Sequence, residues 1–131
     1  MEIDGSNLPL GKHLILEIWG TPYSLPYWNM DEAAVALVNA AKIAGATVLT
    51  ERWHHFGTGY GYTGVVILAE SHLSVHTWPE LGYAAIDAFY CGKCNPENSL
   101  STILDFYKPI NHTASYLNRG IYNYQNDIEF T

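Results

Sequence analysis

The sequence predicts an α+β fold, a two-layer sandwich in which two helices cover one face of a mainly antiparallel sheet. Short segments of apolar and alternating residues recur along the chain and indicate strands. Two further segments carry apolar residues at helical spacing. Short, hairpin-like links connect several of the strands, which favours antiparallel neighbours with the helices on one face of the sheet.

The length and composition indicate a folded globular protein and argue against one that binds nucleic acid. The 131 residues fit a single domain over 1–131, with 48% hydrophobic and 15% charged residues. The net charge of −7 and the total of only six Lys and Arg argue against nucleic acid, because phosphate contacts need clustered cations. The charge is compatible with a cationic substrate. The aromatic share of 14% fits an extensive interface or a pocket for a flat ligand.

The N-terminal sequence predicts a cytoplasmic protein. Residues 1–5 lack the basic region and the apolar core of a secretion signal. No apolar run approaches the roughly 18 residues that span a bilayer. We therefore expect no contact with a membrane.

The first half of the chain is expected to hold three strands and one helix. In order, the expected segments are an irregular lead-in over 1–11, a strand over 13–19, a helix between Asp31 and Gly45, a strand over 46–53, a loop over 57–62 and a strand over 63–70. Asp31 offers a side-chain cap for the start of the helix, and Gly45 offers a left-handed stop at its end. The loop is rich in Gly and Tyr, which is typical of a mobile segment or of one that a ligand approaches closely.

The second half contains three more extended segments and a second helix. The expected segments are a strand over 71–77, a turn over 79–82, a strand over 83–90, a helix from Asn95 to Pro109, a strand over 112–117 and a polar tail over 121–131. Asn95, Pro96 and Glu97 form a typical helix start.

The most informative stretch is 70–80, which reads Glu-Ser-His-Leu-Ser-Val-His-Thr-Trp-Pro-Glu. In an extended strand, His72, Ser74 and His76 share one face, and the intervening residues take the other. One face of the sheet therefore carries groups capable of chemistry.

The residues of this stretch allow several roles. Ser71 could act as a nucleophile with His72 or His76 as its base and Asp87 as an orienting carboxylate. The G-x-S-x-G elbow that presents a hydrolase serine is absent, which argues against such a triad. The two histidines could also bind a metal, although neither an H-E-x-x-H helix nor a matching carboxylate accompanies them. Purely structural roles in a sheet are the remaining alternative.

Two further features are open to more than one interpretation. Glu17 stands in the first strand without an obvious partner, which favours an exposed or interfacial position over a place in a site. Cys91 and Cys94 form a C-x-x-C motif, which could be a redox pair or half of a zinc site. Zinc would need two more ligands, and no paired histidines lie near the motif in the sequence. Cys91 could equally be a buried core thiol.

The stretch 70–80, together with Gly-Tyr-Ala-Ala-Ile-Asp at 82–87 and Cys-Gly at 91–92, resembles the self-processing segment of the short bacterial and archaeal S-adenosylmethionine decarboxylases. The resemblance covers roughly residues 11–120. It implies a pyruvoyl-dependent decarboxylase that makes the aminopropyl donor for spermidine and other polyamines. It also implies a homodimer of cleaved protomers and no metal.

The resemblance implies a route to the pyruvoyl cofactor. Ser71 would attack the carbonyl of Glu70 and turn the peptide bond into an ester. His76 would then remove the α-proton of Ser71, so that the chain is cut into 1–70 and 71–131. The second chain would begin with a pyruvoyl group, whose ketone forms a Schiff base with the substrate amine and serves as an electron sink.

The resemblance also assigns roles around the substrate. Cys91 would donate the proton after decarboxylation, Phe56 would stack on the adenine ring and Glu80 would bind the ribose hydroxyls. Glu17 is expected in the same pocket. Thr63 takes the place of a family serine whose hydroxyl supports processing, and it keeps a hydroxyl.

Some residues depart from the family pattern and leave alternatives open. Lys93-Cys94-Asn95 replaces an acidic stretch, and the loop over 57–62 is one residue longer than in relatives. An enzyme with the same cofactor that decarboxylates ornithine or arginine is therefore one alternative. An uncleaved, non-catalytic homologue that serves as a binding or partner subunit is another.

Overall fold

The computed structural model describes residues 9–24, 27–69 and 71–121. Its elements are β1 (Gly11–Trp19), α1 (Met30–Ile43), β2 (Val48–His55), β3 (Tyr62–Leu68), β4 (Ser71–Trp78), the 3-10 turn η1 (Pro79–Leu81), β5 (Tyr83–Cys91), α2 (Pro96–Tyr107) and β6 (Asn111–Arg119). Except for Ile121, the expected polar tail lies outside the described residues, as does most of the lead-in.

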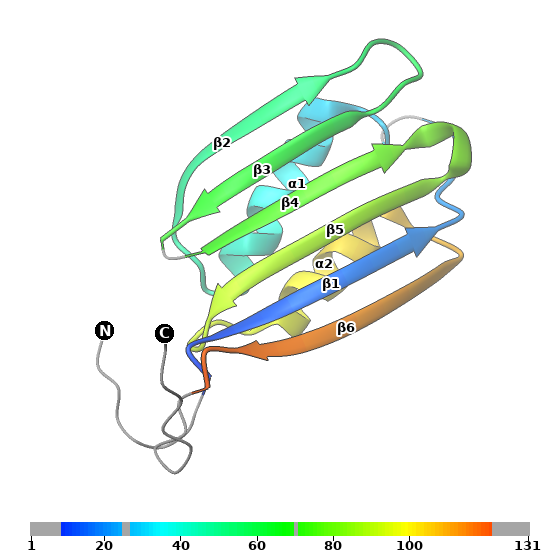
Figure 1. Ribbon diagram of the computed structural model, residues 1–131. Coiled ribbons are helices and arrows are strands. Elements are labelled where there is room, and N and C mark those ends of the chain that lie inside the picture. Colours follow the sequence, from blue (N-terminus) through cyan, green and yellow to red (C-terminus); the bar gives the residue numbers. More distant parts are fainter. Residues whose placement is uncertain (1–8, 25–26, 70, 122–131) are drawn as a thin grey trace, which may run out of the picture.

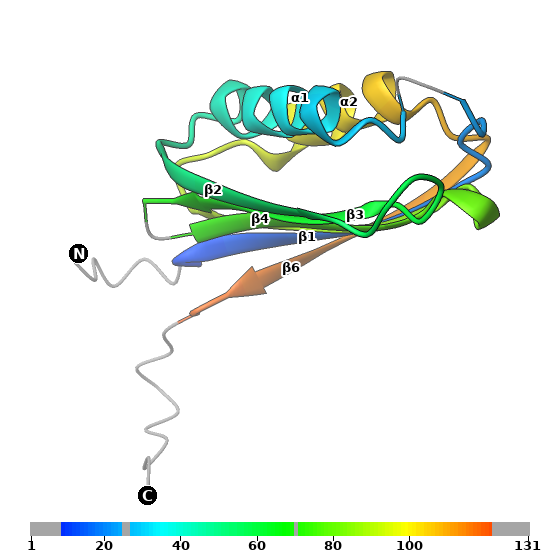
Figure 2. The same ribbon diagram turned by 90° about the horizontal axis from the view of Figure 1, so that it is seen from above.

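The predicted α+β sandwich is confirmed. Six strands form one antiparallel sheet in the order β2-β3-β4-β5-β1-β6 (Figure 1). Both helices lie on the same side of the sheet, and the other side is not covered by any described element (Figure 2). Although β1 comes first in the sequence, it is inserted between β5 and β6, so the two halves of the chain share one sheet.

Alternation along the strands divides the sheet into a core face and an open face. In β1, Leu14, Leu16 and Ile18 are fully buried beneath the helices. Ala33 and Leu37 of α1 are buried in the same core cluster. Because successive strand residues point to opposite sides, the intervening residues of each strand form what we call the open face.

The N-cap of helix α1 lies two residues earlier than predicted. The N-cap is Asn29, whose side-chain oxygen accepts a hydrogen bond from the Glu32 N–H at 2.9 Å. The prediction of Asp31 as the cap is therefore wrong. Asp31 lies in the first helical turn, where a carboxylate still interacts favourably with the helix dipole. The predicted stop at Gly45 is confirmed by its positive φ of 98°.

Strand β2 extends further than the sequence predicted, because its pairing with β3 continues beyond Trp53. His54 and His55 pair with Thr63 and Tyr62, so β2 runs through both histidines and the following loop is shorter than expected. The second helix starts as predicted, with the Asn95 side chain accepting from the Glu97 N–H at 3.0 Å. None of the helices in the described ranges combines the length and apolar character needed to cross a bilayer.

A close contact between β2 and β3 gives a test of the packing. The indole of Trp53 lies directly over Gly64, where an added Cβ would overlap the ring. We expect Gly64→Ala to lower the free energy of unfolding by about 1–3 kcal/mol, because the ring has to move. In a Trp53→Leu background the same substitution should cost much less. Urea denaturation of the four proteins measures this coupling, and an equal loss in both backgrounds would contradict the role of the ring.

Candidate active site

The open face carries the polar side chains of the central strands. His72, Ser74 and His76 of β4 lie on it, while Leu73 and Val75 are fully buried on the core face. The alternation expected for this stretch is therefore confirmed. The same face receives the odd-numbered residues of β5, which pair with the even-numbered residues of β4, and the odd-numbered residues of β1, which pair with those of β5.

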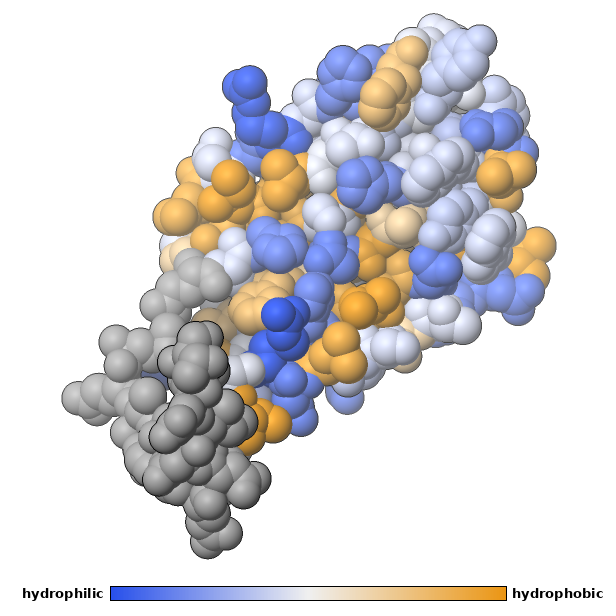
Figure 3. All heavy atoms as spheres, viewed as in Figure 1, coloured by the Kyte–Doolittle hydropathy of each residue, from blue (hydrophilic) through white to orange (hydrophobic). Residues whose placement is uncertain are grey.

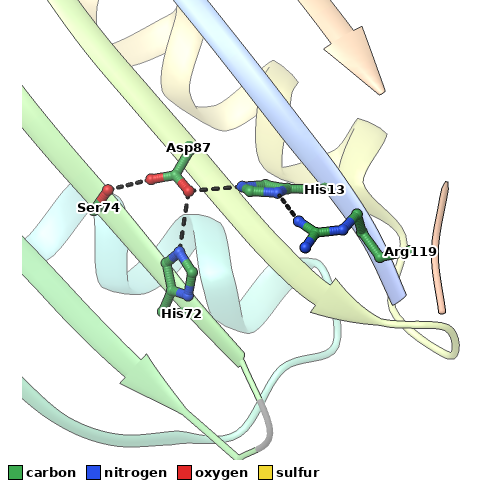
Figure 4. Close-up of polar contacts among 5 residues, drawn as sticks. All are labelled: His13, His72, Ser74, Asp87 and Arg119. Atoms are coloured by element: carbon green, nitrogen blue, oxygen red, sulfur yellow. Dashed lines mark hydrogen bonds and ion pairs between the residues drawn. The ribbon is translucent and has the colours of Figure 1, made fainter. Parts of the chain in front are cut away.

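Asp87 is the centre of a hydrogen-bonded network on this face (Figure 4). Its Oδ2 lies 2.7 Å from His13 Nε2 and 3.0 Å from His72 Nε2. Its Oδ1 accepts a hydrogen bond from the Ser74 hydroxyl. On the far side of the His13 ring, Arg119 Nη1 lies 3.0 Å from Nδ1. The network thus joins β4, β5, β1 and β6.

The chemistry of Arg119 fixes the protonation of this network. A guanidinium can only donate hydrogen bonds, so His13 Nδ1 accepts and the ring proton sits on Nε2, which donates to Asp87. Burial alone would raise the pKa of Asp87. The hydrogen bonds from Ser74, His13 and His72 outweigh that effect, so the pKa of Asp87 is lower than usual.

This arrangement argues against a hydrolase triad, and it argues against a metal at His72, one of the two histidines considered as metal ligands. Asp87 bonds to His72 and His13, whereas the Ser71 hydroxyl donates to the Ala69 carbonyl at 3.4 Å. Ligand atoms of His13, His72 and Asp87 do lie within 4.8 Å of one another. However, the cationic Arg119 beside His13 opposes a bound cation, and the tautomer that it imposes occupies His13 Nε2 with a proton.

A second polar group lies further along the sheet. It consists of Glu17, His76 and Thr63, which lie in one row across the sheet. Ala85 of β5 stands in the same row, between Glu17 and His76. The Thr63 hydroxyl lies 3.2 Å from His76 Nδ1. A small depression of about 170 Å³ on the open face is lined by residues of both polar groups, among them Glu17, Ser74, His76 and Asp87.

Glu17 has a partner that the sequence did not reveal. The Tyr83 hydroxyl donates to its carboxylate at 2.6 Å. This hydrogen bond, with burial and the nearby negative charge, raises the pKa of Tyr83 to about 12. Tyr83 also stacks on Trp19, with ring centroids 4.2 Å apart. Glu17 is thus held on the open face, half-buried. Its place in the substrate pocket stays a prediction.

The candidate residues fall into two groups at different places along the sheet. Ser71 begins β4 and Cys91 ends β5, so both lie at the end that holds the β3–β4 connection (Figure 1). His76 stands five residues further along β4, about 17 Å from Ser71 at roughly 3.4 Å per residue. Phe56 and Glu80 lie beyond His76, both exposed, in the β2–β3 loop and in η1. Within one chain, the structure does not bring these two groups together.

The cleavage site that the sequence predicted lies at a tight hairpin. Leu68 pairs with Ser71, so only Ala69 and Glu70 connect β3 to β4. Glu70 itself lies outside the described residues. A larger cavity of about 630 Å³ is found elsewhere, between the start of α1 and the β2–β3 loop, and it contains none of the predicted site residues.

The molecule is thus an α+β sandwich with a serine directly after a tight hairpin and with acid–base side chains on the open face of its sheet (Figure 2). The family model for S-adenosylmethionine decarboxylase matches residues 12–120. The chain belongs to the S-adenosylmethionine decarboxylase family.

Individual relatives agree with this assignment. An S-adenosylmethionine decarboxylase proenzyme of Methanococcus maripaludis is 46% identical over 113 residues, covering 86% of this chain and 91% of its relative. A proenzyme of the same name from Clostridium kluyveri is 41% identical over 114 residues, covering 86% and 89%. The crystal structure of the adenosylmethionine decarboxylase from Aquifex aeolicus superposes with a TM-score of 0.78 at 28% identity, covering 92% of this chain and 99% of that one.

Sequence reasoning missed three members of the site. His13 and Arg119 did not stand out, because His13 lies 74 residues from Asp87 in the chain and Arg119 lies 106 residues from His13, and strand pairing alone brings them together. Ser74 was placed on the correct face without a role. The alternation of β1 was the one available signal, since it puts His13 and Glu17 on the same face.

The lowered pKa of Asp87 predicts how Asp87→Asn changes stability with pH. Its folded-state pKa lies below the ordinary value of 3.8, so the ionised carboxylate stabilises the fold above about pH 4. That stabilisation is lost as the pH falls through the folded-state pKa. We expect the variant to be less stable than the native protein at pH 6, with the gap narrowing towards pH 3. Thermal unfolding across this range measures the gap.

Asp105→Asn provides the matched control, because it removes an exposed carboxylate from α2. A gap for Asp87→Asn that stays constant from pH 6 to pH 3 would show that the carboxylate charge does not stabilise the network.

Proposed function

We propose that this chain is a self-processing decarboxylase of S-adenosylmethionine, which supplies the aminopropyl donor for spermidine and other polyamines. The observation that carries the proposal is the place of Ser71, at the first residue of β4 after a connection of two residues. Membership of the family and the relatives named as proenzymes support it. A cytoplasmic location, expected from the N-terminal sequence, stays a prediction.

The proposed processing uses residues of this chain alone. The Ser71 hydroxyl attacks the carbonyl carbon of Glu70, and an ester replaces the peptide bond. His76 removes the α-proton of Ser71, and the ester eliminates to leave the Glu70 carboxylate at the end of 1–70. Hydrolysis of the resulting dehydroalanine releases ammonia and leaves a pyruvoyl group at the start of 71–131.

The sheet explains why such a cut is tolerated. The cut lies outside the six residue pairs that join β3 to β4, from Thr63 with His76 to Leu68 with Ser71, so these pairs would remain after it. β1 also stays between β5 and β6, which belong to the other fragment. The two fragments would thus remain parts of one sheet and one core.

The pyruvoyl group, when formed, supplies a carbonyl that binds the substrate amine and accepts the electrons released with carbon dioxide. We assign the following proton transfer to Cys91, at the same end of the sheet as Ser71. Phe56, exposed in its loop, offers an aromatic surface to the adenine ring. The carboxylates of Glu80 and Glu17 suit the ribose hydroxyls and the cationic remainder of the substrate.

We further propose that each site is completed by a second copy of the chain. About 17 Å separates Ser71 from His76 along β4, which is too far for a proton transfer within one chain. An isologous pairing of two open faces can bring the Ser71 end of one protomer to the His76 end of its partner. Thr63, Phe56 and Glu80 would then act together with the partner's Ser71 and Cys91.

The surface of the open face fits such a homodimer. It exposes large hydrophobic side chains around the polar network: Ile15, Trp19, Ile67, Trp78 and Leu117, each 40–47% exposed. Figure 3, which looks onto this face, shows hydrophobic side chains interspersed with polar ones. Large exposed hydrophobic side chains among polar ones are typical of an interface between protein chains.

Ser71→Ala tests the processing and the activity together. The variant should remain one uncut chain and release no carbon dioxide, because a methyl group cannot attack the Glu70 carbonyl. Ser101→Ala, which changes an exposed serine on α2, should be cut and active. Intact mass and parallel release assays with S-adenosylmethionine, ornithine and arginine give the result. Release from ornithine or arginine alone would reassign the substrate, and a native chain that stays uncut would favour the non-catalytic alternative.

Mixing two inactive variants tests the shared site. Ser71→Ala and His76→Ala should each fail to process alone. When they are refolded together, the mixed dimer has one complete site, made by Ser71 of one chain and His76 of the other. We expect cleavage of the His76→Ala chain only, and at most half of the native activity. Mixtures that remain uncut, although light scattering shows mixed dimers, would place both residues in one protomer.

A further inference from the structure

Cys91 and Cys94 lie at the two ends of the turn that joins β5 to α2. The Cys94 N–H donates to the Cys91 carbonyl at 3.0 Å, which makes residues 91–94 a β-turn. The Cα atoms at the ends of such a turn are less than about 7 Å apart. The two Sγ atoms are 3.6 Å apart, and both thiols are free. A disulfide, with its Cα separation of about 4.4–6.8 Å, can therefore form with little movement of the backbone.

Backbone hydrogen bonds to two other parts of the chain hold the turn in place, and they therefore also fix the positions of the two thiols. The Gly92 N–H donates to the Leu10 carbonyl at 2.9 Å, which ties the turn to the start of β1. The Asn95 N–H donates to the Ala44 carbonyl at 2.9 Å, which ties it to the end of α1. The pair is thus preorganised by backbone contacts with two other parts of the chain.

The two thiols differ in a way that suits sequential reaction. Cys94 is 7% exposed and belongs to the core cluster. Its burial and its hydrogen bond with Cys91 raise the pKa of Cys94 to about 11. Cys91 is partly exposed at the strand end. A reagent from solution therefore meets Cys91 first, and Cys94 lies behind it as the second thiol.

The surroundings argue against a zinc site at the same pair. Zinc would need two further ligands beside the thiols. Among the residues that the structure describes, groups of three ligand atoms converge only at His13, His72 and Asp87, and this group contains neither cysteine. A redox role is therefore the better interpretation of the C-x-x-C motif.

We propose that Cys91 and Cys94 form a reversible disulfide that switches the enzyme off under oxidising conditions. The switching effect rests on the proposed function, in which the Cys91 thiol delivers the proton after decarboxylation. In the disulfide this thiol carries no proton, and the donor is lost. The bond itself depends only on the geometry of the turn.

The oxidant is a small-molecule disulfide. The Cys91 thiolate attacks one of its sulfurs, forming a mixed disulfide and releasing one thiol. Cys94 loses its proton and attacks the Cys91 sulfur, which closes the protein disulfide and releases the second thiol. Two protein thiols are oxidised, one disulfide molecule is reduced to two thiols, and an added dithiol reverses the process.

Glutathione redox buffers provide the test on the processed, native protein. Intact mass after rapid alkylation distinguishes the dithiol, the closed disulfide with two hydrogens fewer, and the glutathione adduct. We expect the closed disulfide without an adduct, a parallel loss of decarboxylation rate, and full recovery of the rate in dithiothreitol. The oxidised fraction should rise when total glutathione is diluted at a constant ratio of reduced to oxidised form, because closing the bond releases two thiols.

Cys94→Ala is the matched control, since it keeps Cys91 and removes its partner. This variant should retain the native rate when reduced. In the redox buffer it should carry one glutathione on Cys91, and its modified fraction should not change on dilution at constant ratio, because only one thiol is released.

The outcomes separate the two proposals. Native protein that keeps two free thiols, or stops at the adduct, overturns the disulfide. A closed disulfide with an unchanged decarboxylation rate overturns its effect on the enzyme. If the reduced protein does not act on S-adenosylmethionine at all, the proposed function fails, and the mass readout still decides whether the bond forms.

Discussion

The alternation of side chains along β4, β5 and β1 is the constraint on which the rest of the molecule depends. A strand has only two faces, so each residue given to the core places its neighbours on the opposite side. Here both helices cover the core face, and the other face receives His13, His72, Ser74 and Asp87 from three adjacent strands. The buried core and the polar network therefore arise from one pattern. A shift of register by one residue would exchange them.

The length of the strands sets a limit on what one chain can do with this face. A strand is too stiff to bring its own start near its middle, so groups separated along β4 meet only through another surface. The exposed hydrophobic residues around the Asp87 network offer such a surface. Arg119 on His13 and Tyr83 on Glu17 hold side chains of this face in place, and in the homodimer that we propose they would lie at the interface.

Periodicity and local chemistry predicted the layers of the fold, the faces of β4 and the start of α2 from the sequence. They failed where distant segments decide the result. Asp31 was predicted as the helix cap, but the Asn29 side chain accepts the hydrogen bond from the Glu32 N–H at the start of the helix. Asp87 was considered only as an orienting carboxylate in a triad that the missing elbow argued against, and its contacts with His13 and His72 arise from strand register. The distance from Ser71 to His76 follows from the fact that β4 is one continuous strand. The spacing of these residues in the sequence does not show whether the chain between them is straight or bent.

The insertion of β1 between β5 and β6 has a consequence for folding in the processed form that we propose, in which the chain is cut between Glu70 and Ser71. The intact chain folds as one molecule, and it can thread β1 into place while every segment is still tethered. After the cut, the same sheet has to be rebuilt from two separate polypeptides, so refolding becomes a second-order reaction whose rate falls on dilution. The mature protein would then be maintained by a slow rate of unfolding. In that case the uncut chain can fold by itself, whereas the two fragments of the mature form, once unfolded, would refold only slowly.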